Sequence, residues 1–182
     1  MIQGSGSVIK QNAGALTLGG TGANTYSGGT TLNGGTVAAA KVNALGTGPL
    51  AINAGNLNIA GFNQTVGTVS LVGGSISGTS GQLNGSSYQV QSGTVCARLG
   101  GTGALIKSGG GVATLTGANV FSGGTVINGG TIALNNLFGS GTGSGNVTIN
   151  SGSTLLGMGS LSGAVTIQTG GTISAGSGVG LL

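Results

Sequence analysis

The sequence predicts an all-β protein, a right-handed parallel β-helix of about nine coils of roughly 20 residues each. Three observations lead to this fold class. Short segments of alternating apolar and polar residues lie between Gly-rich turns, no segment of ten or more residues has convincing helical periodicity, and the apolar segments recur at a nearly constant spacing.

The alternating segments are the predicted strands. Clear examples are ALTL at 15–18, LAIN at 50–53, VTIN at 147–150 and VTIQ at 165–168. Glycine accounts for 45 of the 182 residues, and Gly- and Ser-rich chains without a period are usually disordered. Here 37% of the residues are hydrophobic and they are ordered along the chain, which favours a folded protein. Collagen is excluded, because glycine does not occupy every third position.

The spacing of the apolar segments defines the coils. Each repeating unit begins with an apolar residue that marks one register position per coil, and successive ones are 16 to 23 residues apart. A strand–turn repeat of this length without a helix is typical of a β-helix, in which each coil hydrogen-bonds to its neighbours and inward side chains fill a narrow tube. The predicted register positions are Ile9, Leu32, Ile52, Leu71, Val90, Ile106, Ile127, Ile149 and Ile167.

The residue after each predicted register position is polar in all but one coil, and most are Asn or Gln. Stacked amides can hydrogen-bond along the axis of a β-helix, so one hypothesis is an amide-rich ladder at one corner. The alternative is that Asn is simply common in turns. These positions are Lys10, Asn33, Asn53, Val72, Gln91, Lys107, Asn128, Asn150 and Gln168.

A longer unit of several coils occurs twice. The phrase ANTYSGGTTLNGGT in the first copy returns as ANVFSGGTVINGGT in the second, within a module that spans 4–37 and again 101–132. Lys107 matches Lys10, and Phe121 replaces Tyr26 without its hydroxyl, which favours a packing role for that ring. We interpret the repetition as architecture within one β-helix segment, 1–182, because a catalytic motif needs only one copy.

Charge is almost absent. The only charged side chains are Lys10, Lys41, Arg98 and Lys107, giving a net charge of +4, and there is no Asp, Glu or His. These cations are scattered and aromatic residues make up only 3%, so we expect no nucleic-acid partner. No run of about 18 apolar residues suggests a membrane-spanning helix.

The missing residue types also restrict chemistry. General acid–base catalysis near neutral pH draws mainly on His, Asp and Glu, and none is present. We therefore predict no enzyme, with no catalytic, cofactor-binding or metal-binding residue and no small-molecule substrate. A Lys107–Ser108 pair has the residue types of a base and a nucleophile, but turn solvation by the lysine is the favoured interpretation. The single cysteine, Cys96, is expected to be a small buried or half-buried thiol.

The repeated phrase resembles a known family. K-x-x-x-G-x-L-T-L followed by G-A-N-T-Y-S-G-G-T-T-L-N-G-G-T-V is similar to the autotransporter-associated β-strand repeat of Gram-negative autotransporter passengers, and 57–71 and 145–176 support the likeness. The resemblance implies a β-helical stalk, exposed at the cell surface or secreted, that a C-terminal β-barrel translocator carries through the outer membrane. We expect that barrel and the export signals outside this sequence, and this chain to be an internal segment of a longer passenger.

Three functional hypotheses compete, the third of them suggested by the abundance of Thr. The first is a non-catalytic structural stalk or scaffold that displays another domain. The second is an adhesin whose β-helix face binds host surfaces or sister cells, including self-association through flat Thr/Ser/Asn faces. The third, an ice-binding β-helix, requires Thr-x-Thr in one register, and the threonines here do not keep one register.

Overall fold

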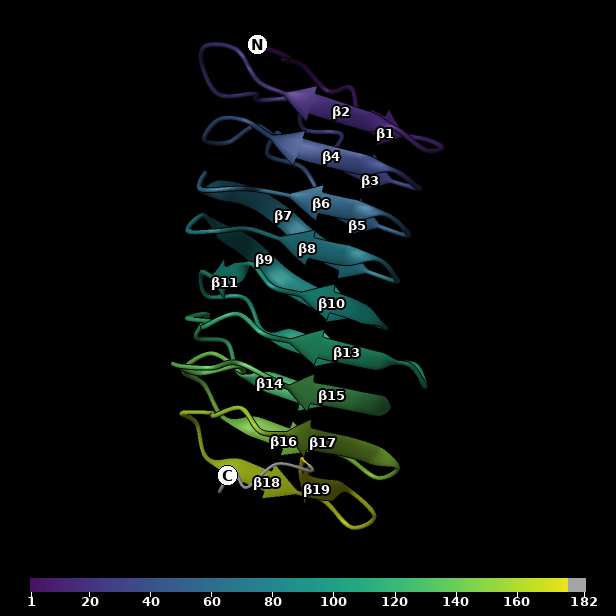
Figure 1. The fold of residues 1–182 in the computed structure, drawn as a ribbon, viewed down its shortest axis with the longest axis vertical. Helices are drawn as coiled ribbons and strands as arrows, with labels where there is room; N and C mark the ends of the chain where they lie inside the picture. The colour runs from purple at the N-terminus through teal and green to yellow at the C-terminus, as the bar shows by residue number, and fades with distance from the viewer. Residues whose placement is uncertain (177–182) are drawn as a thin grey trace.

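The computed structural model describes residues 1–176, and residues 177–182 of the predicted segment lie outside it. Residues 1–176 form a parallel β-solenoid of about nine turns with about 19 residues per turn, and none of them lies in a helix, which confirms the predicted fold class. Figure 1 shows the strands stacked along the long axis, from the N-terminal coil at one end to β18 and β19 at the other. None of the described residues forms a helix long and apolar enough to cross a membrane.

Two parallel sheets form the walls of the solenoid, and each coil contributes a strand to both. One sheet contains β1 (Val8–Lys10), β3 (Thr30–Leu32), β5 (Leu50–Ile52), β7 (Gln64–Leu71), β9 (Gln82–Val90), β12 (Leu105–Lys107), β14 (Thr125–Ile127), β16 (Val147–Ile149) and β18 (Val165–Ile167), with β11 (Arg98–Gly100) paired to β9. The other contains β2 (Ala15–Leu18), β4 (Thr36–Ala39), β6 (Asn56–Asn58), β8 (Ser75–Ser77), β10 (Gly93–Val95), β13 (Val112–Leu115), β15 (Gly130–Leu134), β17 (Ser153–Gly157) and β19 (Thr172–Ala175).

Alternation along these strands fills the space between the sheets. In β3, β5 and β14 the first and third residues are buried and the middle one is half-buried, as expected when successive side chains point to opposite faces. Leu32, Ile52, Leu71 and Val90 stand in register in four successive coils, and all four are buried. The core is therefore one continuous apolar column along the axis.

Two of the nine predicted register positions are wrong by one residue. Lys10, not Ile9, is in register with Leu32, and Lys107, not Ile106, is in register with Val90 and Ile127. Ile9 faces outward and is 57% exposed. Each lysine thus stands at a position that other coils fill with an aliphatic side chain.

A lysine is accommodated there because its ammonium reaches backbone carbonyls at the corner of the coil. Lys107 is fully buried, and its Nζ donates to the carbonyl oxygens of Ser108 at 2.8 Å, Gly109 at 2.9 Å and Gly129 at 2.9 Å. Its aliphatic stem replaces the missing Leu or Ile in the column. Burial lowers the pKa of the Lys107 ammonium, because desolvation disfavours the charged form.

The amide ladder is confirmed in two stretches of the corner. Asn33 donates to the side chain of Gln11 at 3.1 Å, and Asn53 donates to Asn33 at 2.7 Å. Farther along, Asn150 donates to Asn128 at 2.6 Å. Gln11 takes the ladder position that Lys10 was predicted to hold, because the register of that coil is shifted by one residue.

Candidate functional site

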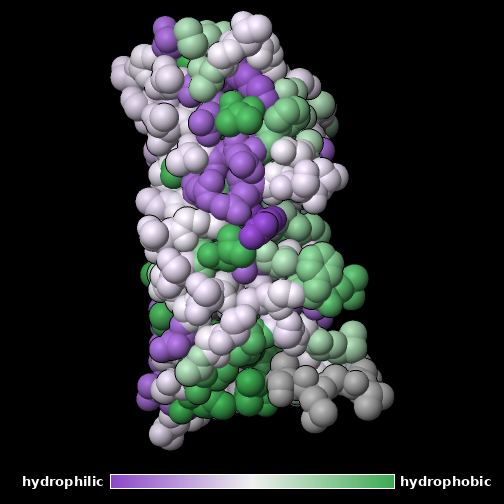
Figure 2. Space-filling model, turned by 90° about the vertical axis from the view of Figure 1, so that its left-hand side faces the viewer, coloured by the Kyte–Doolittle hydropathy of each residue, from purple (hydrophilic) through white to green (hydrophobic). Residues whose placement is uncertain are grey.

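The connections on the two sides of the solenoid differ in length. Short turns join most strands of the first sheet to the next strand of the second, whereas most connections back to the first sheet are longer loops. Figure 2 shows the side of the molecule that lies on the left in Figure 1, where these long loops gather. We call this side the long-loop face. Its exposed large apolar residues are Val42, Phe62, Val120, Leu137, Phe138 and Met158.

The Asn of the repeated G-A-N phrase holds neighbouring long loops together. Asn119 is buried; its Oδ1 accepts from the Leu99 N–H at 2.8 Å and its Nδ2 donates to the Gly141 carbonyl at 2.7 Å. Asn24 makes the same pair of contacts in the first copy, with the coil before it and the coil after it. One amide therefore satisfies a backbone donor and a backbone acceptor in two different coils.

The aromatic residue of the phrase is a packing residue, as predicted. Tyr26 and Phe121 are both fully buried. Each ring lies under a glycine of the next coil: a Cβ on Gly46 would stand 2.7 Å from the Tyr26 ring, and one on Gly143 would stand 2.9 Å from the Phe121 ring. Both glycines also have positive φ, of 71° and 74°, so the loop needs glycine at that position for two reasons.

The module leaves a shallow hollow on the long-loop face each time it occurs. Both hollows begin at the same place in the phrase, at Ala23–Asn24 and at Ala118–Asn119. The first has a volume of about 390 Å³ and is lined by 23–25, Asn43, Thr47 and 65–67. The second has a volume of about 440 Å³ and is lined by Arg98, 118–120, 138–140, 143–144 and Ser162.

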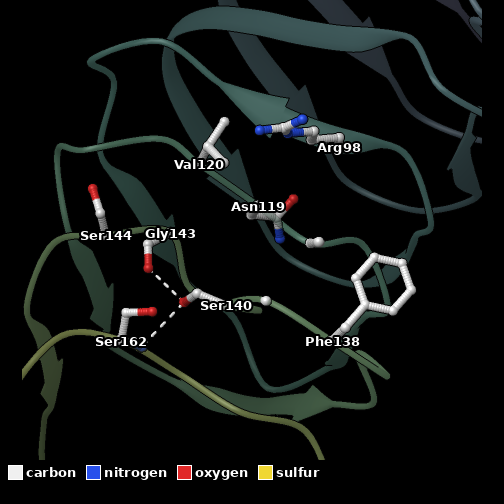
Figure 3. Close-up of a pocket in the computed structure, with 10 residues that line it drawn as sticks. Arg98, Asn119, Val120, Phe138, Ser140, Gly143, Ser144 and Ser162 are labelled. Carbon is white, nitrogen blue, oxygen red and sulfur yellow. Dashed lines mark hydrogen bonds between the residues drawn. The ribbon is translucent and has the colours of Figure 1, made fainter.

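The second hollow differs from the first in two side chains. It has Arg98 and Phe138 in its wall, and the lining of the first hollow includes neither a cation nor an aromatic residue. Figure 3 shows Arg98 and Phe138 on different sides of the hollow, with Asn119 between them and Ser144 and Ser162 at the end away from Phe138. Phe138 is 75% exposed, which is unusual for a phenylalanine.

A third hollow adjoins the second. It has a volume of about 320 Å³ and shares Arg98, Ala118 and Phe138 with the second hollow. Its other lining residues are Thr79, Ser80, Cys96, Thr116 and Gly117. The two hollows therefore form one longer depression, which we call the Arg98–Phe138 groove.

Local hydrogen bonds hold Phe138 at the rim of this groove. Asn136 is buried, and its Nδ2 donates to the carbonyls of Phe138 at 3.3 Å and Gly139 at 3.0 Å, and to Ser160 of the next coil at 3.2 Å. The loop that carries Phe138 is longer than its counterpart. The Asn24–Ala44 contact spans 20 residues, and the matching contact of Asn119 spans 22, so the second loop has two additional residues.

Arg98 comes from a different element. It is the first residue of β11, which pairs with the N-terminal part of β9 through Arg98 and Gln82. Its side chain is exposed, and no acidic side chain can neutralise it because the sequence contains no Asp or Glu. The groove thus has an exposed cation whose charge the protein itself leaves uncompensated.

The structure also places the other residues that the sequence singled out. Cys96 is exposed, which corrects the prediction of a buried or half-buried thiol, because it lies where β10 has ended and it lines the third hollow. The Lys107 ammonium donates to the Ser108 carbonyl and not to its hydroxyl, so turn solvation is confirmed for this pair.

Sequence reasoning missed the Arg98–Phe138 groove, because the two residues are 40 positions apart and only coil stacking brings them together.

Comparison with protein families identifies part of the chain. Residues 8–39 and 105–134 match the model of the passenger-associated-transport-repeat. Both segments are therefore similar to repeats of autotransporter passengers. This confirms the resemblance that the G-A-N-x-[YF]-S-G-G-T phrase suggested. Searches of curated proteins and of solved structures found no match.

Each matched segment contains the residues described above as the organisers of its coils. The first contains Lys10, Asn24 and Tyr26, and the second contains Lys107 and Asn119. The residues that recur within this repeat therefore position backbone and core. Arg98 and Phe138 lie just outside the second matched segment, at 105–134.

Proposed function

We propose that this chain is part of the non-catalytic scaffold of a bacterial autotransporter passenger displayed at the cell surface. The observation that carries the proposal is the coincidence of two passenger-associated-transport-repeat segments with a continuous parallel β-solenoid. A solenoid of this kind gains length by adding coils, and each coil contacts only its neighbours, which suits a stalk. The translocator that would carry it belongs, on this proposal, to a part of the protein outside this sequence.

The composition supports the same function. An unfolded chain must pass the outer membrane and then fold without help from charge pairs, because the sequence has no acidic residue to form one. Folding here depends on apolar side chains and amide hydrogen bonds that each coil makes with the coil beside it. Repeat architectures of this type can nucleate locally and propagate coil by coil.

Surface display is tested in cells that express the complete gene containing this segment. An epitope tag inserted after Gly20, an exposed residue in the long loop between β2 and β3, should be accessible to antibody on intact cells and removed by added protease. The same tag detected only after lysis would overturn the proposal. Reading the gene on both sides of the segment checks independently for an export signal and a translocator domain.

An adhesive role is the second candidate function. The observation that favours it is the Arg98–Phe138 groove, since a pure stalk has no need of an exposed aromatic residue beside an uncompensated cation. Aromatic residues, Phe among them, and Arg are enriched at protein interfaces relative to the rest of the surface. Cells that display the passenger should then bind a surface more strongly than cells that display the same passenger with Phe138→Ala.

A further inference from the structure

We propose that the Arg98–Phe138 groove binds an acidic saccharide, a pyranose chain that carries a carboxylate. The proposal goes beyond the scaffold function and does not depend on it, because binding concerns the folded coils whereas display concerns their export. Four observations support it: the shape of the groove, the charge of Arg98, the exposure of Phe138 and the contrast with the first hollow.

The shape fits a short stretch of a polymer. The groove consists of two adjoining hollows of about 440 and 320 Å³, each in the range of small-ligand sites. Neither hollow is an enclosed cavity, so a chain can lie along them without having to enter through an end. Arg98 and Phe138 belong to both hollows and stand where such a chain would cross from one to the other.

The charge indicates an anion with one acidic group at this point. The Arg98 guanidinium presents a planar fork that matches a carboxylate in a bidentate pair. No acidic side chain exists in the chain to compete for it or to repel an anionic ligand. Lys10, Lys41 and Lys107 are absent from the lining of both hollows, so the groove offers one cation. A nucleic acid, which needs several phosphate contacts, fits poorly.

The same argument excludes a second copy of this chain as the occupant. A copy brings no Asp or Glu that could neutralise Arg98, and two molecules of net charge +4 repel each other. The partner must supply the negative charge. Carboxylate-bearing saccharides do so at regular intervals along a chain whose remaining surface is hydroxyl and C–H.

Phe138 and its surroundings match that remaining surface. The face of a phenyl ring is partly negative and attracts the partly positive C–H bonds on one side of a pyranose ring. Ser80, Thr79 and Thr116 in the third hollow and Ser162 in the second bring hydroxyl groups suited to sugar hydroxyls. Asn136 fixes the backbone beside Phe138, so the ring is offered at a defined place on the rim.

The first hollow provides an internal comparison. The repeat builds it with the same G-A-N backbone and nearly the same volume, but Asn43 and Thr65 are found in its wall and no cation or aromatic residue is. The hollow itself is therefore a consequence of the fold. What is added in the second hollow is Arg98 and the two-residue extension of the loop that carries Phe138.

The test measures binding of tri-galacturonic acid to the immobilised folded chain, with the neutral tri-galactose as the reference ligand. We expect the acidic trimer to bind at least tenfold more tightly than the neutral one and to weaken as salt is raised. Arg98→Gln and Phe138→Ala should each reduce the affinity at least tenfold. Phe138→Trp should retain it, because the ring is what the sugar contacts.

Matched controls separate a site from a sticky surface. Leu137→Ala removes a side chain that is 94% exposed beside Phe138 but lines neither hollow, and Thr65→Ala alters the first hollow. Both should bind within twofold of the unaltered protein, and circular dichroism should show that every variant keeps its β-sheet content. All the substituted positions are exposed, so the variants should fold.

Three results would overturn the proposal. The first is equal binding of the acidic and neutral trimers, or no binding of either at millimolar concentration. The second is an unchanged affinity in both Arg98→Gln and Phe138→Ala. The third is tighter binding of a poly-glutamate peptide or a single-stranded oligonucleotide than of tri-galacturonic acid, which would assign the groove to another class of partner. None of these results bears on surface display, which the tag experiment measures separately.

Discussion

The two copies of the repeated module are similar in sequence but differ in their surroundings. β1 of the first copy pairs with one strand, β3, whereas β12 of the second pairs with β9 on one side and β14 on the other. Lys10 is consequently half-buried, and Lys107 is fully buried although its neighbours in sequence are similar. Burial in a solenoid is therefore conferred by the neighbouring coils and not by the local phrase.

The comparison also separates two kinds of residue. Those that recur with both copies make backbone or core contacts that each coil needs: the lysine and the G-A-N asparagine inside the module, and the glycine over the aromatic ring in the loop that follows it. Those found beside only one copy, Arg98 and Phe138, lie on the surface. Repetition thus marks architecture, and departure from it marks the place where a function can be added.

The largest effect is expected from a methyl group over the aromatic ring. In Gly143→Ala the new Cβ would overlap the Phe121 carbonyl oxygen and press on the ring at 2.9 Å, and alanine disfavours a φ of 74°. We expect a loss of about 3–5 kcal/mol in the free energy of unfolding, measured by urea denaturation. Gly46→Ala, at the same place over Tyr26, should lose a similar amount.

Gly14→Ala is the control for backbone strain alone. Gly14 also has a positive φ, of 94°, but no atom lies within 4 Å of the place that a Cβ would take there. It should lose only about 1–2 kcal/mol. Equal losses at Gly14 and Gly143 would contradict the claim that the ring and the glycine pack as a pair.

The second effect concerns the two lysines. Lys107→Met keeps the aliphatic stem but leaves three corner carbonyls without their donor, and we expect a loss of about 2–3 kcal/mol in urea denaturation. Lys10→Met should lose about 1 kcal/mol or less, because water reaches the carbonyls of the first coil. A stabilised Lys107→Met protein would show that desolvation of the ammonium outweighs its three hydrogen bonds.

These lysines also show how far the sequence predicts the fold. The coils follow from alternation and spacing, so 15–18, 50–53, 147–150 and 165–168 contain strands as expected. The sequence misassigns two register positions because hydrophobicity favours Ile over Lys, and nothing in a single strand reveals that a corner carbonyl cluster lies within reach of the ammonium. Such clusters exist only after neighbouring coils have stacked.

The groove is beyond sequence reasoning for a related reason. Arg98 begins a short strand that pairs along only part of β9, a feature with no counterpart among the other described strands. Phe138 lies in a loop whose length differs between the copies, and loop conformation depends on contacts such as those of Asn136 with Ser160 in the next coil. The spacing of Arg98, on a short strand, and Phe138, in a distant loop, follows no pattern in the sequence that would predict that they line one groove.

The third effect tests the one chemical difference between the aromatic sites of the repeated phrase. The Tyr26 hydroxyl lies 2.6 Å from Thr30 Oγ1, which in turn donates to the Leu45 carbonyl at 2.9 Å. Tyr26→Phe should therefore lose about 1 kcal/mol in thermal or urea unfolding. The reverse change, Phe121→Tyr, should be neutral within about 0.5 kcal/mol, because Thr125 already occupies the place of Thr30. A large loss in Phe121→Tyr would show that the two aromatic sites are not equivalent.

The fourth effect is a change in stability at a pH above 10.0, the ordinary pKa of tyrosine. Burial raises the pKa of Tyr26 and of Tyr88, so the folded state holds these phenol protons more tightly and loses stability as the pH rises past 10. Lys107 acts in the opposite direction. Its pKa is lowered in the folded state, so the folded protein gains stability relative to the unfolded protein as the pH rises through the ordinary pKa of lysine. Because two phenols oppose one amine, we expect the urea midpoint to decrease overall as the pH rises past 10. This decrease should be smaller in Tyr26→Phe and larger in Lys107→Met.

The last prediction is that the stability of the protein does not change between pH 4.5 and 7. Acid denaturation usually follows from carboxylates and histidines that titrate differently in the folded and unfolded states, and this sequence has no Asp, Glu or His in either copy of the module or between them. The urea midpoint should therefore stay constant across this range, in contrast to its decrease above pH 10. A midpoint that moved between pH 4.5 and 7 would require a titrating side chain that the sequence does not contain. Since neither copy of the repeat depends on a charge that titrates in this range, the same flat profile should hold for any number of coils stacked in this way.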